Sequence, residues 1–422
     1  MFKLKCQNVL QNNRIKNFVI YGIGQIVNLV SPLLVMPYLV AVCGKEGLGK
    51  IGVGFSFALV LNVLVDYGSY INGTKEISIN RKNPEIIRTK IVSIYVMKFF
   101  LILFSSFIAF LLIYFIPFFN KEQGVFFFSF LYVIGQFLNP TWIFQGVENY
   151  KWISFINIIS KVIYVACVFI FITKRDDYIY ANAYLGFGLI ISSLIGLIYL
   201  IKKYDLQFYH NVIKDALVLL KEEFSLTFSQ LFLSFYQYLP IMIISYVGGN
   251  GMAGQYRIIE QIVMTFRSYL QMFFNFIYAD VCLQIHTSLK KGVSHWLKYN
   301  GLNYIFILLL VFIAFVFAEE VLLYFNIETN DLKPMVYFFR LGLIIPIFMA
   351  ISFALKQLLF ALDKNKVYIN ITIGSSIFSL LAFFLLVKTI GLQGAFIATI
   401  FIEIMVIVLY CAVLKPIIRL SK

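Results

Sequence analysis

The chain has 422 residues and a net charge of +15; 61% of its residues are hydrophobic, 18% are aromatic and only 13% are charged. Soluble domains are nearer a quarter charged, so this composition excludes an ordinary soluble enzyme. It also excludes a soluble nucleic-acid-binding protein, because the basic residues lie mostly in short loops between long apolar runs.

Twelve apolar runs of about 20 residues or more fill the chain almost end to end. A helix rises about 1.5 Å per residue and the hydrocarbon layer is about 30 Å thick, so each run is long enough to cross a bilayer. We therefore predict an all-α integral membrane protein with twelve transmembrane helices. The predicted spans are 17–42, 50–71, 91–116, 125–146, 152–173, 180–201, 224–247, 256–284, 300–318, 335–360, 367–387 and 394–414.

The basic residues outside the spans are divided unevenly between the two sides of the membrane. The side with both termini and the longer loops 72–90 and 202–223 carries roughly three times as many Lys and Arg residues as the other side. Cytoplasmic loops are enriched in Lys and Arg. We therefore expect both termini in the cytoplasm. An even number of spans is consistent with that, because it places both termini on the same side.

A weak internal repeat relates the two halves of the chain. A shift of 205 residues superposes Gln25 on Gln230, Val42 on Val247, Gly44 on Gly249 and Gly49 on Gly254. Each set lies on the first span of a six-span half and on the loop after it. We predict two six-helix bundles around a central cavity, an architecture that recurs in transporters. The expected division is an N-terminal lobe at 1–201, a cytoplasmic linker at 202–223 and a C-terminal lobe at 224–422.

The predicted eighth span has one polar face. At 100° per residue, Arg257, Glu260, Arg267 and Gln271 fall within an arc of about 120°, opposite an arc of Ile, Val, Leu and Phe. An arginine at the centre of a membrane helix costs on the order of 2.5–3.5 kcal/mol, and a wet cavity removes most of that cost. The alternatives are that Arg257 snorkels to the interface and that Arg267 pairs with a neighbouring acid.

Other polar residues lie on spans that the repeat makes equivalent. Spans 1, 2, 7 and 8 all have polar faces, which favours one shared lumen, although amides and hydroxyls also join packed helices. Exposed cations in such a lumen suit an anionic cargo such as a phosphate or an acidic sugar. The expected cargo-contacting residues are Arg267, Lys161, Arg257, Lys98, Gln25, Asn28, Gln230 and Gln271. The acids Asp66, Glu260 and Glu403 are candidates for ion coupling or for pairing with these cations.

Several kinds of site have no signal in the sequence. There is no Gly-x-x-x-x-Gly-Lys-Ser/Thr motif, which would indicate a built-in ATPase. The three histidines lack the spacing of metal ligands. We therefore expect no metal, no cofactor and no enzymatic activity.

Three segments resemble the Wzx-type polysaccharide (O-antigen) flippases. They are Ser31-Pro-Leu-Leu-Val-Met-Pro-Tyr38 followed by Gly44-Lys-Glu-Gly-Leu-Gly49; Asp66-Tyr-Gly-Ser69 followed by Thr74-Lys-Glu-Ile-Ser and Arg81; and Pro140-Thr-Trp-Ile-Phe-Gln-Gly-Val-Glu148. The family belongs to the multidrug/oligosaccharidyl-lipid/polysaccharide exporter superfamily, with twelve helices in two six-helix lobes. The segment Tyr256-Arg-Ile-Ile-Glu260 departs from the small residues that family members often have there.

The resemblance implies a function for the predicted cavity. It implies that undecaprenyl-diphosphate-linked sugar repeat units move from the inner to the outer leaflet of the bacterial cytoplasmic membrane by alternating access. The glycan, membrane lipid, and polysaccharide polymerase and chain-length proteins are the expected partners. Two alternatives stay open: an ion-coupled drug exporter, which the basic face disfavours, and a membrane polysaccharide polymerase, which the short outer loops disfavour.

Overall fold

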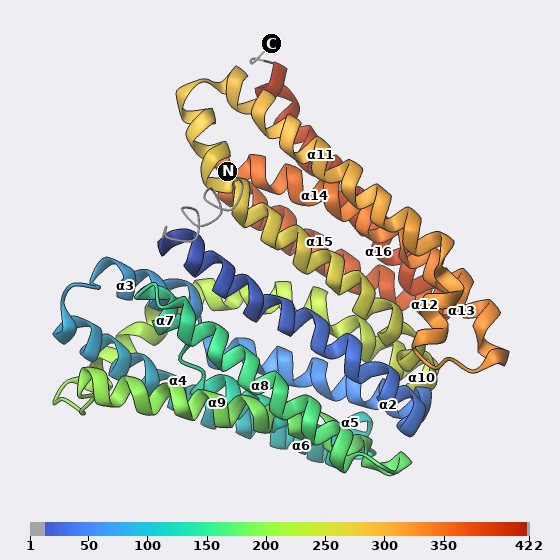
Figure 1. Cartoon of the computed structure of the whole chain (residues 1–422), viewed down its shortest axis with the longest axis horizontal. Helices are drawn as coiled ribbons and strands as arrows, with labels where there is room; N and C mark the ends of the chain where they lie inside the picture. The colour runs from blue at the N-terminus through green and yellow to red at the C-terminus, as the bar shows by residue number, and fades with distance from the viewer. Residues whose placement is uncertain (1–12, 420–422) are drawn as a thin grey trace, which may run out of the picture. The chain divides into compact units, whose positions relative to one another are not determined.

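The computed structural model describes residues 13–419, and these residues are almost entirely helical (Figure 1). The elements are α2 (Asn13–Asp66), the π-helix η1 (Ser69–Gly73), α3 (Thr74–Ile79), α4 (Pro84–Phe115), α5 (Pro117–Asn120), α6 (Gln123–Leu138), α7 (Thr141–Gly146), α8 (Tyr150–Phe171), the 3-10 helix η2 (Arg175–Tyr180), α9 (Ala181–Tyr204), α10 (Val212–Thr287), α11 (Leu289–Val316), α12 (Ala318–Tyr324), α13 (Thr329–Gly342), α14 (Ile344–Ala361), α15 (Asn365–Ile390) and α16 (Leu392–Arg419). The prediction of an all-α protein is confirmed.

Ten helical segments of residues 13–419 are long and apolar enough to cross a membrane. Eight of them have ordinary spanning lengths, between 22 and 33 residues. The other two, Gly22–Asp66 and Gln230–Tyr278, have 45 and 49 residues, about twice the roughly 20 residues that one crossing needs. Together the ten segments overlap all twelve runs that the sequence predicts.

Each of the two long segments is broken at one glycine. Gly44 in α2 has φ 71° and ψ 175°, and Gly249 in α10 has φ 81° and ψ 170°. Positive φ is strained for residues with a Cβ, so glycine permits a sharp change of direction within a single residue. The loops expected at 43–49 and 248–255 are therefore one-residue breaks between helices. The two glycines form one of the 205-residue repeat pairs, and their backbones have nearly the same conformation.

The described residues form two compact units. The first unit contains 13–35 and 50–234, and the second contains 36–49 and 235–419. Both α2 and α10 contribute residues to each unit. The expected linker at 202–223 consists of the end of α9, a short loop and roughly the first three turns of α10, all of which belong to the first unit.

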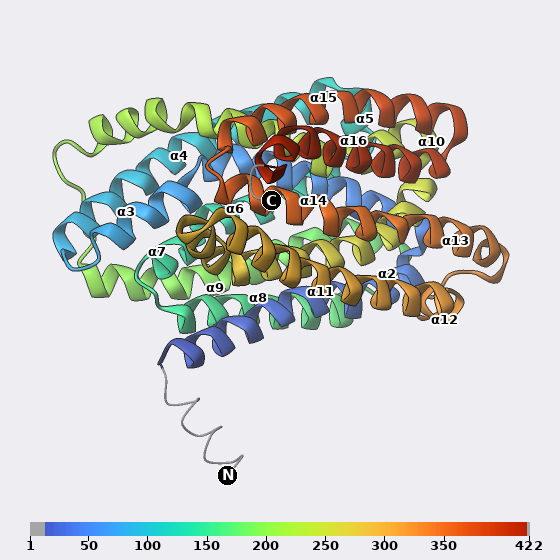
Figure 2. The ribbon, with the colours of Figure 1, turned by 90° about the horizontal axis from the view of Figure 1, so that it is seen from above.

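The first unit is organised around close contacts of α6, α8 and α9 (Figures 1 and 2). Gly186 of α9 lies against the backbone of Leu131 and Tyr132, and Gly188 lies against the Ser160 carbonyl of α8. Small residues permit such short distances between membrane helices. A buried cluster with members from α3, α4, α7, α8, α9 and α10 includes Ile77, Ile91 and Trp142; its further members are Tyr67, Ile87, Ile94, Met97, Leu101, Ile143, Phe144, Ile153, Ile156, Leu200 and Ala216.

The second unit packs α11, α14, α15 and α16 around the later part of α10. Two side chains join these helices through backbone oxygens. The Trp296 indole of α11 donates to the Ala354 carbonyl at 2.9 Å, and the Gln357 amide donates to the Phe274 carbonyl at 3.1 Å. These bonds fix α14 between α10 and α11.

A reciprocal glycine contact joins two segments of the second unit. A Cβ added at Gly49 would lie 1.9 Å from the Asn250 carbonyl oxygen, and one added at Gly254 would lie 1.8 Å from the Lys45 carbonyl oxygen. Residues 45 and 250, like 49 and 254, are 205 apart, so the contact follows the internal repeat. Lys45 also forms an ion pair with Asp331, which anchors the same segment.

Candidate functional site

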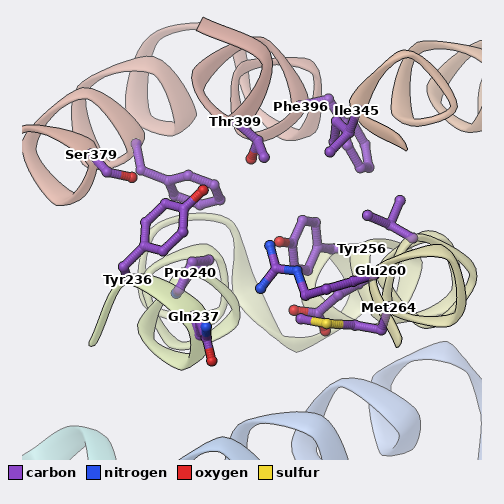
Figure 3. Close-up of a pocket in the computed structure, with 13 residues that line it drawn as sticks. Tyr236, Gln237, Pro240, Tyr256, Glu260, Met264, Ile345, Ser379, Phe396 and Thr399 are labelled. Atoms are coloured by element: carbon purple, nitrogen blue, oxygen red, sulfur yellow. The ribbon is translucent and has the colours of Figure 1, made fainter. Parts of the chain in front are cut away.

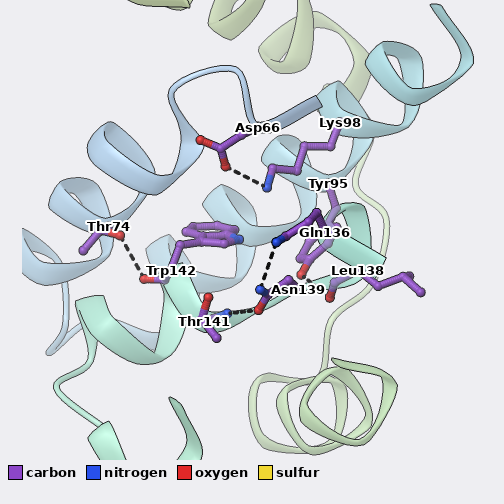
Figure 4. Close-up of polar contacts among 9 residues, drawn as sticks. All are labelled: Asp66, Thr74, Tyr95, Lys98, Gln136, Leu138, Asn139, Thr141 and Trp142. Carbon is purple, nitrogen blue, oxygen red and sulfur yellow. Dashed lines mark hydrogen bonds and ion pairs between the residues drawn. The ribbon is translucent and has the colours of Figure 1, made fainter. Parts of the chain in front are cut away.

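Lys98 in the first unit is enclosed (Figure 4). This α4 residue is 2% exposed, its Nζ lies 3.5 Å from Oδ1 of Asp66, and the Trp142 ring centroid lies 5.9 Å away. Asp66 is the last residue of α2, and its side chain is 35% exposed. Tyr67 and Gly68 follow with positive φ and turn the chain into η1. The charge on Lys98 is therefore balanced by one carboxylate inside a packed region, which favours the pairing role among the roles proposed for Asp66.

A network of polar contacts supports the ring that covers Lys98. The Thr74 hydroxyl donates to the Trp142 carbonyl at 3.1 Å, and the Thr141 backbone N–H donates to Asn139 Oδ1 at 3.1 Å. The Asn139 amide donates to Gln136 Oε1 at 3.1 Å. Figure 4 shows these residues around the turn between α6 and α7. The turn thus fixes the indole beside the ion pair.

Lys161 of α8 has a different environment. It is half-buried, its Nζ lies 5.9 Å from the Tyr164 ring centroid, and no carboxylate forms an ion pair with it in the part of the chain that the structure describes. One face of α8 is bonded to α2, because the Ser154 hydroxyl donates to the Ile20 carbonyl at 2.7 Å. Gln25 and Asn28, both half-buried, lie on α2 just after this contact.

Gln230 and Gln271 are both half-buried residues of α10 and belong to different units. Gln230 lies in the first unit. Gln271 lies in the second, where its amide donates to Asn275 Oδ1 at 2.9 Å.

A small pocket in the second unit, with a mixed apolar and polar lining, contains two of the predicted residues, Glu260 and Arg267 (Figure 3). We call it the Arg267 pocket. It is lined by Tyr236, Gln237, Pro240, Tyr256, Glu260, Val263, Met264, Arg267, Ile345, Ser379, Phe383, Phe396 and Thr399. The lining residues of α10 come from both sides of the break at Gly249, and α14, α15 and α16 supply the rest. Its volume of about 40 Å³ is enough for a few water molecules.

Glu260 on the wall of the Arg267 pocket is paired with a predicted cation. The Arg257 guanidinium lies 2.7 Å from Glu260 Oε2, and the Glu260 residue is 7% exposed. The two residues are three apart on α10, which places them on adjacent turns of the helix. Arg257 is therefore engaged beside the pocket through its own acid.

Glu403 of α16 adjoins the same wall. This residue is 7% exposed; its Oε2 accepts from the Ser352 hydroxyl at 2.7 Å, and its Oε1 accepts from the Tyr236 hydroxyl at 3.4 Å. Arg267 is close enough to act electrostatically on both Glu403 and Tyr236. Tyr236 lines the pocket and donates to Glu403, so it connects the buried carboxylate with the pocket.

The sequence did not identify two important partners in this cluster. Tyr236 and Ser352 come from α10 and α14, whereas Glu403 is on α16. A buried carboxylate needs hydrogen-bond donors, so the sequence implied that donors exist near Glu403. It could not say which, because the contacts join residues 167 and 51 positions apart. Among the residues described, no group of three or more His, Cys, Asp or Glu side chains could hold a metal ion.

Comparison with known proteins assigns a family to this arrangement. A family model described as "Polysaccharide biosynthesis protein" matches residues 15–279. A protein of Shigella dysenteriae described as "Putative O-antigen transporter" is 24% identical, with 96% of this chain and 100% of that protein covered. A protein of Escherichia coli (strain K12) with the same description is also 24% identical, with 66% of this chain and 67% of that protein covered.

Solved structures agree on the fold. An inward-facing multidrug resistance MATE family transporter of the MOP superfamily matches with a TM-score of 0.72 at 14% identity, covering 96% of this chain and all of that one. A MOP superfamily transporter from Pyrococcus furiosus matches with a TM-score of 0.57 at 13% identity, covering 96% of this chain and 94% of that one. The matches confirm the resemblance to Wzx-type flippases: this multi-pass membrane transporter belongs to the polysaccharide biosynthesis protein family.

Proposed function

We propose that the protein moves undecaprenyl-diphosphate-linked oligosaccharide from the inner to the outer leaflet of the bacterial cytoplasmic membrane by alternating access. The observation that carries the proposal is Arg267: a basic side chain in a membrane-embedded helix of a polysaccharide-family transporter, lining a pocket together with Glu260 and Gln237. Dragging a diphosphate and hydrated sugars through hydrocarbon costs several kcal/mol for each unsatisfied polar group. A cation-lined path lowers that cost.

The proposal includes a topology of twelve crossings. The segments broken at Gly44 and Gly249 are each long enough for two crossings, which raises the ten apolar segments to twelve. With twelve crossings, both termini lie on one side, and the excess of Lys and Arg assigns that side to the cytoplasm. The proposed topology has two six-helix lobes, 1–201 and 224–422, which the segment 202–223 connects. The two lobes would surround a central cavity.

The cargo would meet basic and amide side chains from both lobes. We propose Arg267, Arg257, Lys161, Gln25, Asn28, Gln230 and Gln271 for this contact. The Arg267 pocket has room for a few water molecules and not for a sugar, so contact with the cargo requires a wider state of the same surface. Because Lys98 is enclosed with Asp66, its access to cargo requires the largest rearrangement of the eight predicted residues.

We propose that acidic residues of the second unit couple transport to a proton or cation gradient. Glu403 combines burial, two hydroxyl partners and proximity to Arg267, which suits a carboxylate that binds and releases a proton or a cation. Glu260 is the second candidate, held by Arg257. Polymerase and chain-length proteins would receive the exported glycan as partners. The likeness to multidrug transporters at 14% identity concerns the fold and does not favour a drug cargo.

The proposal is tested in a bacterial strain that lacks this protein. Arg267→Ala should fail to restore surface polysaccharide, and lipid-linked repeat units should accumulate on the inner leaflet. Arg340→Ala is the matched control, because Arg340 is exposed and lies over the Phe315 ring. Both variants are measured for their amount in the membrane. Normal surface polysaccharide in the Arg267→Ala strain would contradict the role of the pocket, and an unchanged distribution of lipid-linked glycan after deletion would contradict the function itself.

A further inference from the structure

A second and larger cavity lies in the first unit, where α7 ends and α8 begins. It is lined by the consecutive residues 147–152 and by Lys203 in the last turn of α9, and its volume is about 410 Å³. We call it the rim pocket. Ligand sites commonly have volumes of several hundred Å³, so the rim pocket is large enough for a small polar group. None of the residues proposed for cargo transport lines it.

The rim pocket has an excess of positive charge. Lys151 and Lys203 line it and are exposed, and neither forms an ion pair with a carboxylate within residues 13–419. Glu148 also lines it, but Arg81 lies 2.7 Å from the Glu148 carboxylate and offsets that charge. The positive end of the 22-residue helix α8 adds to the same field. An anion is the ligand that this charge distribution favours.

Stacked aromatic rings lie next to the lysines of the rim pocket. Trp152 stacks on Tyr199 with a centroid distance of 4.5 Å and on Phe144 at 5.4 Å. The Lys203 ammonium lies 5.8 Å from the Tyr199 ring centroid and 5.2 Å from that of Tyr204. Tryptophan and tyrosine are enriched at the level of lipid headgroups. The rim pocket therefore has the composition of a membrane interface.

An apolar surface leads away from the rim pocket along α8. Phe155, Val162 and Phe169 are exposed, and their spacing from Lys151 places all four on one face of the helix. Ile198 and Ile201 are exposed on α9, which packs against α8 (Figures 1 and 2). In a membrane protein, such a surface contacts acyl chains. A ligand with an anionic head and apolar tails would occupy the pocket and this surface at once.

We propose that the rim pocket binds the phosphate headgroup of a membrane lipid, with its acyl or polyprenyl chain along the exposed face of α8. The phosphate comes from one of two sources: an anionic glycerophospholipid, or the diphosphate of the polyprenyl-linked glycan. The first source is independent of the proposed transport function; the second places an entry site for the cargo at the inner edge of the first unit and rests on that function.

The test uses the purified full-length protein and counts bound lipids by native mass spectrometry. Phosphatidylglycerol and undecaprenyl diphosphate are titrated separately and then in competition. One of the two lipids is expected to bind the wild type more tightly. The double variant Lys151→Gln/Lys203→Gln should bind that lipid roughly tenfold to thirtyfold more weakly than the wild type does, because each lysine near a lipid phosphate contributes to affinity. Lys202→Gln is the matched control, since Lys202 is an exposed neighbour on α9 that does not line the pocket. Thermal unfolding of each variant reports whether it is folded.

The competition identifies the source. Displacement of phosphatidylglycerol by equimolar undecaprenyl diphosphate supports the cargo as the ligand, and no displacement supports the bulk lipid. Wild-type affinity for both lipids in the folded double variant would overturn the proposal, as would an equal loss in Lys202→Gln. Loss of lipid binding is measured on the purified protein, whereas the transport function is tested by the distribution of lipid-linked glycan in the deletion strain. A failure of the binding proposal is therefore distinguishable from a failure of the proposed transport function.

Discussion

Lys98 in the first unit and Arg267 in the second are both basic residues of membrane-embedded helices, but their surroundings differ. Lys98 is 2% exposed and contacts the Asp66 carboxylate beneath the Trp142 ring. Arg267 is half-buried and lines a pocket with room for a few water molecules, next to a carboxylate, Glu403, that accepts hydrogen bonds from two hydroxyl groups. A membrane cation can thus serve packing or transport, and the open space beside it distinguishes the two cases.

The largest expected effect comes from breaking the enclosed pair. Asp66→Asn leaves the Lys98 ammonium without a carboxylate in a packed region, so we expect the free energy of unfolding to fall by about 2–4 kcal/mol. Thermal and denaturant unfolding in detergent measures this. Lys98→Met/Asp66→Asn is the control and should recover most of the loss, because it removes both charges. Equal stability of Asp66→Asn and the wild type would show that Lys98 is not confined as described.

A smaller effect is expected for the ion pair at the Arg267 pocket. Arg257→Ala removes the cation 2.7 Å from Glu260, but pocket water can solvate the remaining carboxylate. We expect a loss of about 1–2 kcal/mol of unfolding free energy. The double variant Arg257→Ala/Glu260→Gln removes both charges and should recover the lost unfolding free energy. A loss as large as that of Asp66→Asn would mean that the pocket is as dry as the surroundings of Lys98.

A third buried acid, Glu223, has an amide as its hydrogen-bond partner. Glu223, before the apolar part of α10, is 9% exposed and accepts from the Asn72 amide at 2.6 Å. Burial raises the pKa of Glu223 above its usual value. The folded state therefore binds the proton more tightly than the unfolded state does. Stability should be greater below the ordinary glutamate pKa and should fall as the pH rises toward the raised one.

The pH dependence of Glu223 is expected to be about 1 kcal/mol or less. Hydrogen exchange of the amides in 212–224, compared at pH 7 and pH 5, should show slower exchange at pH 5 after correction for the intrinsic rate. Glu223→Gln should exchange at nearly the same corrected rate at both values. Faster corrected exchange of the wild type at pH 5 would contradict the direction of the shift.

The smallest effect on stability is expected at Glu403. Glu403→Gln keeps an oxygen that accepts from Ser352 or Tyr236, so the unfolding free energy should change by less than about 1 kcal/mol. Transport should nevertheless lose its response to proton or sodium gradients in proteoliposomes. Glu319→Gln, a change of an acid at the start of α12, is the control. A gradient response that persists in Glu403→Gln would remove Glu403 from the coupling role.

The sequence predicted the helices better than the contacts between them. Apolar runs fix which segments cross a membrane, and the 205-residue shift identified Gly44 and Gly249 as equivalent positions, which proved to have matching backbones. The expected loops around these glycines were too long, because one residue with positive φ is enough to redirect a helix.

For the candidate site too, the sequence predicted features of single helices and not the contacts between helices. A 100° projection placed Glu260 and Arg267 on one face of a helix, and both line the Arg267 pocket, whereas Arg257 and Gln271 of the same face do not. It could not show that Lys98 meets Asp66, or that Tyr236 and Ser352 bond to Glu403, because those contacts depend on how separate helices pack. Packing between helices is not encoded in the periodicity of any one of them.

The most direct test compares transport per folded molecule in two matched variants. Lys98→Met/Asp66→Asn removes the enclosed pair, and Arg267→Met removes the cation beside the pocket. Both are reconstituted in proteoliposomes, and transfer of a polyprenyl-diphosphate-linked glycan is measured against the amount of folded protein. We expect the first to transport within about twofold of the wild type and the second to be at least roughly tenfold slower. Equal rates in the two variants, or a slower rate in the first, would contradict the account.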